Sequence, residues 1–333
     1  MAKLLLAGEP LIRICPDQCR PLSNACSSQV FFGGSEVNIA RTISGFGGET
    51  RLLTALPDNP VGHAFNLFLR QSQIDTNLIS WEGKRIGLYY LENGFGCRSS
   101  KVCYDRAGSS FTEMSLKNYD FDQIFEDITH FHFSGISLAL GQSSQDLIEF
   151  LAVEAKKRKI CVSFDLNFRS SIISKNAAKS LFSRFANYAD IIFGIDPLML
   201  NDSDLTMFDR DQADSSTIKK RLSGLYQRYC LQAIFHTVRE KTLCSSNRFK
   251  AYAFDGQYQE SVEISTPILQ RVGSGDAFVA GALYQLMQGN DMVSCINFAT
   301  AAASLKCTVA DDQLYVSVQQ VKDILKNKRD IQR

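Results

Sequence analysis

Short apolar runs alternate along most of the chain with longer segments in which apolar residues recur at helical spacing. The runs with the composition of buried strands are Lys3–Gly8, Arg51–Ala55, His130–Ser134, Ile160–Asp165, Ile191–Gly194 and Ala233–Val238. The longer segments predict helices at Glu36–Phe46, Pro60–Gln71, Ser144–Lys157, Asn176–Tyr188, Thr217–Tyr229, Asp276–Met287, Met292–Lys306 and Ser317–Lys326. Buried strands that alternate with helices are typical of a parallel sheet covered by helices, so we predict an α/β fold.

Two segments interrupt this alternation. Residues 11–32 and 85–106 are rich in β-forming residues and glycine, and the second contains Asn93-Gly94, a dipeptide common in hairpin loops. Because both segments fall early in the chain, we predict that they form a small β lid that covers a ligand. The predicted core then comprises residues 1–10, 33–84 and 107–333.

Charge and composition exclude several classes of function. The 36 Lys and Arg residues nearly balance the 35 Asp and Glu residues, so no strong field favours nucleic acid or an anionic membrane. No apolar run reaches the roughly 18 residues of a membrane span, and Met1–Gly8 lacks the pattern of a signal peptide. Ten cysteines without such a signal predict reduced thiols in the cytoplasm. Cys15, Cys19 and Cys26 lack the paired spacing of a zinc site, and we assign no metal ligand.

The strongest local signal is Gly273-Ser274-Gly275-Asp276, which precedes a predicted helix. The two glycines allow a tight turn with exposed amides, and the start of a helix attracts an anion. Asp276 would lie at the mouth of this anion site, where it could accept a proton from a hydroxyl that attacks phosphorus. The residues alone leave an alternative open, in which Asp276 is the N-cap of a helix after a glycine turn.

A second glycine pair precedes the first predicted helix. Gly33 and Gly34 are followed by Glu36 and Asn38, which fall in the first turn of that helix and could present polar groups to a polyol. A turn and a capped helix explain the same residues equally well.

These two segments together resemble the ribokinase-like (pfkB) sugar kinases, which carry a Gly-Gly segment early and a G-x-G-D segment late in the chain. The resemblance covers nearly the whole chain. It implies a doubly wound, mostly parallel sheet flanked by helices, with a small β-sheet lid over the sugar site. It also implies transfer of the γ-phosphoryl group of ATP, with Mg²⁺, to a sugar hydroxyl. Asp276 would then be the general base, and the amides of Gly273, Ser274 and Gly275 the anion hole.

Within this family the chain is most similar to the 2-keto-3-deoxygluconate kinases. Arg13 stands where members that act on neutral sugars usually have an aspartate. Tyr104 and Arg106, with Tyr89 on the partner strand, match a pattern that binds sugar acids. Arginine suits a carboxylate because its guanidinium is always charged and presents a fork of donors. On the residues alone, the tyrosines fit ordinary packing and Arg106 a solvated strand position.

The stretch from Asp165 to Arg169 resembles the Asp-x-Asn-aromatic-Arg sequence of the same kinases, although Arg169 alone fits a surface charge. The segments around Thr237 and Asp312 match the second nucleotide loop and the edge of the sugar site, and either could equally be an exposed turn or a polar helix end. The resemblance implies sugar contacts by Gly33, Gly34, Glu36, Asn38, Tyr89, Tyr104, Arg106, Arg169 and Asp312. It implies ATP contacts by Asn167, Arg169, Thr237, Arg239, Lys241, Gly273 and Gly275.

Two departures from the family pattern concern cations. The Asn-x-x-Glu that organises Mg²⁺ is replaced by Ile195-Asp196-Pro197-Leu198. Gln270 stands where an aspartate opens the anion-hole segment and assists a monovalent cation in some members. We still expect Mg²⁺ as a cofactor with ATP, whereas Gln270 argues against activation by a monovalent cation.

We predict an ATP-dependent kinase that phosphorylates the terminal hydroxyl of 2-keto-3-deoxygluconate. A fructokinase-like enzyme acting on a neutral sugar is one alternative. A catalytically weak homologue that binds a sugar acid is the other, because of the departures above. The lid resembles those that pair with a second subunit, so we expect a homodimer.

Overall fold

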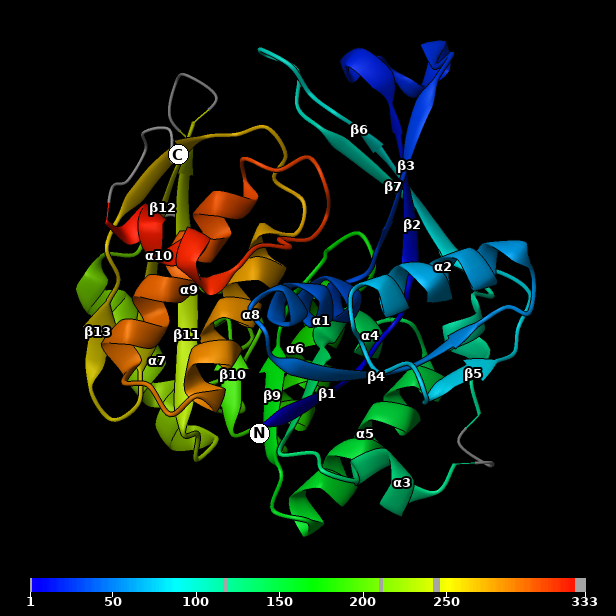
Figure 1. Ribbon diagram of the computed structural model, residues 1–333. Helices are drawn as coiled ribbons and strands as arrows, with labels where there is room; N and C mark the ends of the chain where they lie inside the picture. Colours follow the sequence, from blue (N-terminus) through cyan, green and yellow to red (C-terminus); the bar gives the residue numbers. More distant parts are fainter. Residues whose placement is uncertain (1, 116–118, 210–211, 242–245, 327–333) are drawn as a thin grey trace.

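The computed structural model describes residues 2–115, 119–209, 212–241 and 246–326. Within these residues one large sheet is covered by helices, and a smaller sheet stands apart from it (Figure 1). The strands of the large sheet are β1 (Lys3–Ala7), β4 (Glu49–Leu56), β5 (Ile79–Trp81), β8 (His130–Ser134), β9 (Cys161–Asp165), β10 (Ile191–Phe193), β11 (Ala233–Lys241), β12 (Ser246–Phe254), β13 (Tyr258–Glu260) and β14 (Ile264–Pro267).

The large sheet is mostly parallel. Its strand order is β13-β12-β11-β10-β9-β8-β1-β4-β5, and β14 also pairs with β12. All neighbours from β11 to β5 run parallel, whereas β12 pairs antiparallel with β11, β13 and β14. The fold class predicted from the sequence is confirmed, and the six predicted strands are all present.

Helices cover both faces of this sheet. They are α1 (Ser35–Gly45), α2 (Pro60–Gln71), α3 (Phe121–Phe125), α4 (Gly135–Leu138), α5 (Gln142–Lys157), α6 (Lys175–Ala186), α7 (Ser215–Arg228), α8 (Ser274–Met287), α9 (Met292–Lys306) and α10 (Val318–Leu325). Buried side chains of α5, α6 and α7 belong to one apolar cluster, and those of α1, α2, α8 and α9 to another. The sheet separates the two clusters, because alternate residues of a strand point to opposite faces.

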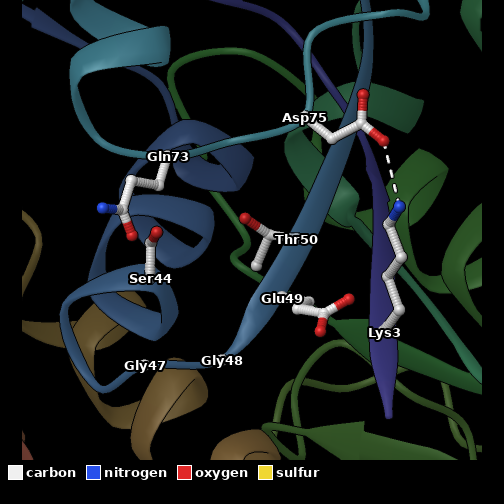
Figure 2. Close-up of a pocket in the computed structure, with 8 residues that line it drawn as sticks. All are labelled: Lys3, Ser44, Gly47, Gly48, Glu49, Thr50, Gln73 and Asp75. Carbon is white, nitrogen blue, oxygen red and sulfur yellow. Dashed lines mark hydrogen bonds and ion pairs between the residues drawn. The ribbon is translucent and has the colours of Figure 1, made fainter. Parts of the chain in front are cut away.

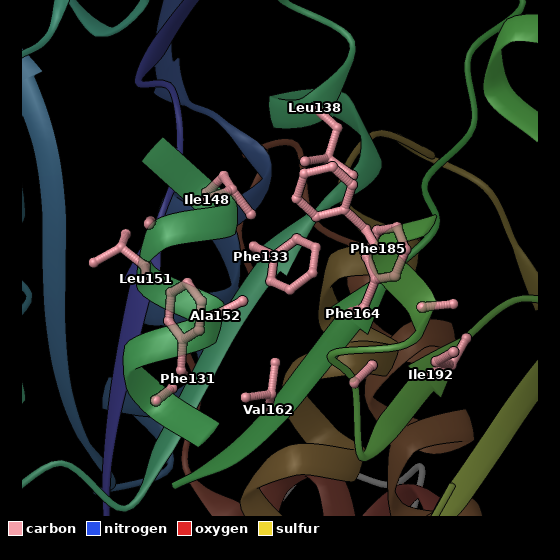
Figure 3. Close-up of a cluster of buried hydrophobic side chains, with 14 of the residues drawn as sticks. Phe131, Phe133, Leu138, Ile148, Leu151, Ala152, Val162, Phe164, Phe185 and Ile192 are labelled. Carbon is pink, nitrogen blue, oxygen red and sulfur yellow. The ribbon is translucent and has the colours of Figure 1, made fainter. Parts of the chain in front are cut away.

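Phenylalanines form the centre of the first cluster. Phe131 and Phe133 of β8 point toward α5 and α6, and the ring of Phe133 stacks on that of Phe164 in β9 with centroids 4.6 Å apart (Figure 3). Burying each such ring contributes roughly 2–3 kcal/mol. This packing holds the strands in register and thereby fixes where their carboxyl ends lie.

The small sheet contains β2 (Leu11–Pro16), β3 (Ser28–Gly33), β6 (Gly87–Glu92) and β7 (Lys101–Asp105), in the order β3-β2-β6-β7. These strands come from the two segments that interrupt the alternation of the sequence. Only residues 8–10 separate β1 from β2, so the chain passes directly from the large sheet into the small one.

One strand is longer than predicted. The predicted strand ended at Val238, followed by the second nucleotide loop or an exposed turn, but β11 continues to Lys241 and pairs with β12. Thr237 lies opposite Ala251 and Arg239 opposite Phe249. The antiparallel pairing explains the difference, because a hairpin arm tolerates polar residues on its exposed side. None of the described helices is long and apolar enough to span a bilayer.

Candidate active site

The two edges of the large sheet differ. At the edge where β1 and β4 begin, a polar pocket is lined by residues that include Lys3, Glu49 and Thr50, and Lys3 pairs with Asp75 at 3.0 Å (Figure 2). Ligands of doubly wound α/β proteins bind at the other edge, beyond the carboxyl ends of the strands. The residues singled out in the sequence gather at that second edge.

Helix α8 begins there at a glycine turn. Gly273 is its N-cap and adopts a φ of 78°, and a Cβ at this position would lie 1.7 Å from the carbonyl oxygen of Asp312. Only glycine fits this close approach. The amide of Ser274 donates to the carbonyl of Arg271 at 3.2 Å, so one of the three predicted anion-hole amides has a partner here. A helix N-terminus supplies further amide donors and positive potential.

Asp276 lies in the first turn of α8 and contacts α1. Its two carboxylate oxygens accept hydrogen bonds from Ser35 Oγ at 3.0 Å and from Asn38 Nδ2 at 2.7 Å. Burial raises the pKa of Asp276, and these two donors partly oppose the shift. The N-cap alternative is wrong, because the cap is Gly273 and Asp276 is three residues further along. The structure thus brings the two glycine segments of the sequence together at one carboxylate.

A second acid lies close by. Asp165 ends β9, and burial together with the charge of Asp276 raises its pKa to about 7. Asn167, in a left-handed conformation at φ 35°, donates from its backbone to Asp165 Oδ1 and from Nδ2 to Ser35 Oγ, at 3.1 and 3.0 Å. Neither Asp165 nor Ser35 had a predicted role. An acid at the carboxyl end of a predicted buried strand was the available signal.

Glu36 is enclosed rather than exposed toward a ligand. Its Oε1 accepts hydrogen bonds from Ser134 Oγ at 2.6 Å and Ser137 Oγ at 3.0 Å, and burial raises its pKa to about 7. Gly8 makes room for it, because a Cβ there would lie 2.1 Å from Glu36 Cδ. In this structure Glu36 links α1 to the end of β8 and is buried, and its contact with a sugar stays a prediction.

Asp312 is bound by residues of the small sheet. Arg13 Nε lies 2.7 Å from its Oδ1, and Tyr89 donates to its Oδ2 at 2.7 Å. The side chains of Arg13 and Asp312 are each only 1% exposed. Gly33 permits the contact, because a Cβ added at this position would lie only 2.8 Å from Asp312 Oδ2. Burial raises the pKa of Asp312, while Arg13 opposes the shift.

Arg106 forms a second buried ion pair. Its Nε donates to Glu9 Oε2 at 2.6 Å, and Ser109 Oγ also donates to Glu9. The Nη1 of Arg106 is buried and has no hydrogen-bond partner among the described residues. Tyr104 packs beside this arginine, with the guanidinium carbon 5.5 Å from the ring centroid. Glu9 was not singled out in the sequence.

Two arginines flank the N-terminus of α8. The Nη2 of Arg239 would lie 3.4 Å from a Cβ placed on Gly275. Arg169 is exposed, and its charge lowers the pKa of both Asp165 and Asp276. Thr237 is half-buried within β11. The side chain of Lys241, a predicted nucleotide contact, lies outside the described residues.

Among the described residues no group of three His, Cys, Asp or Glu side chains could hold a metal ion. Asp196, at the position that departs from the family pattern, accepts a hydrogen bond from the amide of Phe208 at 3.0 Å.

Comparison with known proteins identifies the class. The family model described as pfkB family carbohydrate kinase matches residues 1–317. The chain belongs to the pfkB family of carbohydrate kinases. It is therefore a phosphotransferase by family.

Three relatives are similar over most of their own length. The 2-dehydro-3-deoxygalactonokinase of Haloferax volcanii is 28% identical, over 98% of this chain and 97% of its own. The crystal structure of 2-dehydro-3-deoxygluconokinase from Thermotoga maritima superimposes with a TM-score of 0.90 at 29% identity, covering 98% of this chain and 100% of that one. The 5-dehydro-2-deoxygluconokinase of Clostridium perfringens is 25% identical, over 93% of this chain and 88% of its own.

Proposed function

We propose that this pfkB kinase transfers phosphate from ATP to the terminal hydroxyl of a 2-keto-3-deoxy sugar acid, with 2-keto-3-deoxygluconate as the expected substrate. The observation that carries the proposal is the position of Asp276. Its carboxylate lies in the first turn of α8, beside the amide donors of the helix N-terminus, and is held by Ser35 and Asn38. A proton acceptor beside an anion site is what phosphoryl transfer to an alcohol requires.

In the proposed reaction, Asp276 acts as the general base. Ser35 and Asn38 each occupy one acceptor direction of its carboxylate, which leaves other lone pairs for the substrate hydroxyl. The hydroxyl oxygen forms a bond to the γ-phosphorus of ATP, the bond to the bridging oxygen breaks, and ADP leaves. The hydroxyl proton passes to Asp276. Most of the acceleration comes from alignment and from neutralisation of charge.

The proposed phosphate site lies around the start of α8. Arg239 stands against Gly275, and Arg169 contributes positive potential to the same region. Both are always-charged donors suited to phosphate oxygens. Mg²⁺ enters as part of the MgATP substrate, because this ion keeps much of its water and binds substrate phosphates.

The names of the relatives support a sugar acid as the acceptor, since those described above act on dehydro-deoxy sugar acids by name. In this chain the unpartnered Nη1 of Arg106, beside Tyr104, is the donor that we assign to the substrate carboxylate. Tyr89 and Asp312, with Gly33, would contact the hydroxyl groups.

A neutral sugar is the second candidate, and one observation favours it. Arg13 and Arg106 are both neutralised by buried carboxylates, Asp312 and Glu9, so neither offers a free positive charge. A fructokinase-like activity would need no such charge. The third possibility, a sugar-acid-binding protein, would bind without consuming ATP.

An ADP-release assay with a panel of acceptors tests the proposal. We expect 2-keto-3-deoxygluconate or its galacto epimer to give a kcat/KM at least about tenfold above fructose and ribose. Faster turnover of fructose would favour the second candidate, and binding without ADP release the third. In Arg106→Lys, which keeps the charge opposite Glu9, we expect KM to rise for the sugar acid and not for fructose.

Assembly and location complete the proposal. The edge strands β3 and β7 of the small sheet expose Val30 and Val102, at 62% and 48%. Exposed strand edges pair readily with another chain, so we propose a homodimer formed through this sheet. Light scattering at micromolar concentration tests whether the protein is a dimer.

The ten cysteines favour the cytoplasm as the location of this protein.

A further inference from the structure

Lys306 is a buried lysine behind the anion site. It is the last residue of α9, and its side chain is completely enclosed. Its Nζ donates to the carbonyl oxygens of Val309 at 3.0 Å and of Gln270 at 3.5 Å. Burying an ammonium is costly unless such acceptors compensate it, and the carbonyl end of a helix favours a cation. The two carbonyls therefore form a defined cation position.

The two carbonyls belong to different segments of the active site. Gln270 lies three residues before Gly273, and Val309 lies three residues before Asp312. Lys306 Cε itself would lie 3.4 Å from a Cβ placed on Gly273. Its ammonium thus joins the segment that enters α8 to the segment that carries Asp312, directly behind the first residue of the glycine turn.

The charges around Lys306 keep it cationic near neutrality. Burial lowers its pKa to about 8, and the nearby Asp312 and Asp311 oppose this shift while Arg13 adds to it. Because phosphoryl transfer places negative charge at the α8 N-terminus, a fixed cation behind the turn stabilises that charge without reorganisation.

We propose that Lys306 is a positioning residue whose ammonium, bound to the carbonyls of Gln270 and Val309, fixes the glycine turn and takes the place that a free monovalent cation would fill. Main-chain carbonyls are the ligands that bind potassium in proteins, and ammonium is of similar charge and size. The inference rests on the proposed kinase function. It predicts that the enzyme works without an added monovalent cation.

The first experiment uses the unmodified protein. Turnover is measured with its best acceptor at equal ionic strength, in sodium, potassium, ammonium or tetramethylammonium chloride. We expect rates that agree within about twofold, because the cation position is already filled. Activation by potassium of about tenfold or more would overturn the proposal.

Two substitutions separate charge from bulk. Lys306→Ala opens the position, and we expect kcat to fall at least about tenfold while KM for the sugar stays within about threefold. Ammonium or potassium should then raise kcat of this variant at least about threefold, and tetramethylammonium, which is too large, should not. Lys306→Met fills the space without charge and should stay slow in every salt. Lys322→Met, at an exposed lysine of α10, is the matched control and should match the parent protein.

The outcomes are distinguishable. Lys306→Ala that is folded, slow and equally slow in all four salts overturns the proposal, and so does Lys306→Met with normal kcat. If Lys306→Ala does not fold, Lys306→Met and the salt series on the parent protein decide. If no sugar or sugar acid supports ADP release by the parent protein, the proposed function is refuted, and this result does not depend on Lys306.

Discussion

Two groups of buried or half-buried carboxylates lie at the candidate active site, and their partners differ. Glu36, Asp165 and Asp276 belong to the large-sheet core and accept hydrogen bonds from hydroxyl, amide and backbone donors. Glu9 and Asp312, by contrast, form ion pairs with arginines that come from the small sheet or follow it. Burial raises the pKa of all five groups.

Whether the partners are neutral donors or arginines decides which of two roles such a carboxylate can have. A carboxylate held by neutral donors keeps its affinity for a proton, so it can accept one during a reaction. A carboxylate held by an arginine is committed to that cation and instead fixes the relative positions of two segments. The first group therefore suits chemistry, and the second suits the attachment of the small sheet.

The largest expected effect is at the proposed base. Asp276→Asn keeps the shape of the side chain but removes its proton affinity, so kcat should fall about 10³-fold while sugar binding changes only severalfold. Steady-state kinetics and calorimetry measure the two. Asp165→Asn is the control within the same group and should lose less. Near-normal turnover of Asp276→Asn would remove Asp276 as the base.

The ion-paired group should respond in stability. Asp312→Asn leaves Arg13 buried without its counter-charge, so the free energy of unfolding should fall by about 3 kcal/mol. Denaturant unfolding measures it. The double variant with Arg13→Met should recover part of the loss, because the unpaired charge is then absent. Asp122→Asn breaks an exposed pair with Arg158 and should change little. Equal losses at Asp312 and Asp122 would contradict the comparison.

A smaller effect is expected at Gln313. Its Nε2 donates to Asn38 Oδ1 at 2.8 Å, which orients the Asn38 amide so that Nδ2 points to Asp276. Gln313→Leu removes this constraint, and kcat should fall about tenfold with little change in KM. Gln319→Leu, which removes a hydrogen bond to Asp323 within α10 and lies outside the candidate site, is the control. A change in melting temperature without a change in kcat would show that Gln313 does not position the base.

The last effect concerns pH. The pKa of Glu36 is raised from 4.5 to about 7. Between these two pH values the folded protein therefore holds a proton on Glu36 that the unfolded chain has already released. The contribution of Glu36 to stability is therefore greatest below about pH 4.5 and falls as pH rises toward 7, by at most about 1.4 kcal/mol per unit for one proton. Glu36→Gln, which still accepts from both serines, should show a shallower fall. An unchanged slope would assign the titration to another group.

Local chemistry made part of this site predictable. Gly273 and Gly34 have backbones at φ 78° and 121°, and both open helices, so their sequence neighbourhood alone indicates a turn with exposed amides. The alternation of strands and helices predicted the large sheet for the same reason, because each element has its own periodicity.

Long-range pairings were not predictable. Arg13 and Asp312 are 299 residues apart, and Glu9 and Arg106 are 97 apart, so neither pair shows a sequence pattern. Which acid pairs with which arginine depends on how the small sheet packs against the core, and this is a property of the whole fold. Lys306 is a further example, since a lysine that ends a helix is usually solvated.

The connection between β1 and β2 has a consequence for protein engineering. Glu9 lies on this connection, and its partners Arg106 and Ser109 lie on the segment that leads from β7 back to the large sheet. One buried contact therefore joins two of the segments that connect the two sheets. Moving the small sheet from one kinase to another would therefore separate buried partners unless Glu9 moves with it. A transplant of residues 11–33 and 87–109 into a protein without an acid at the position of Glu9 would bury the guanidinium of Arg106 without a counter-charge and destabilise the hybrid.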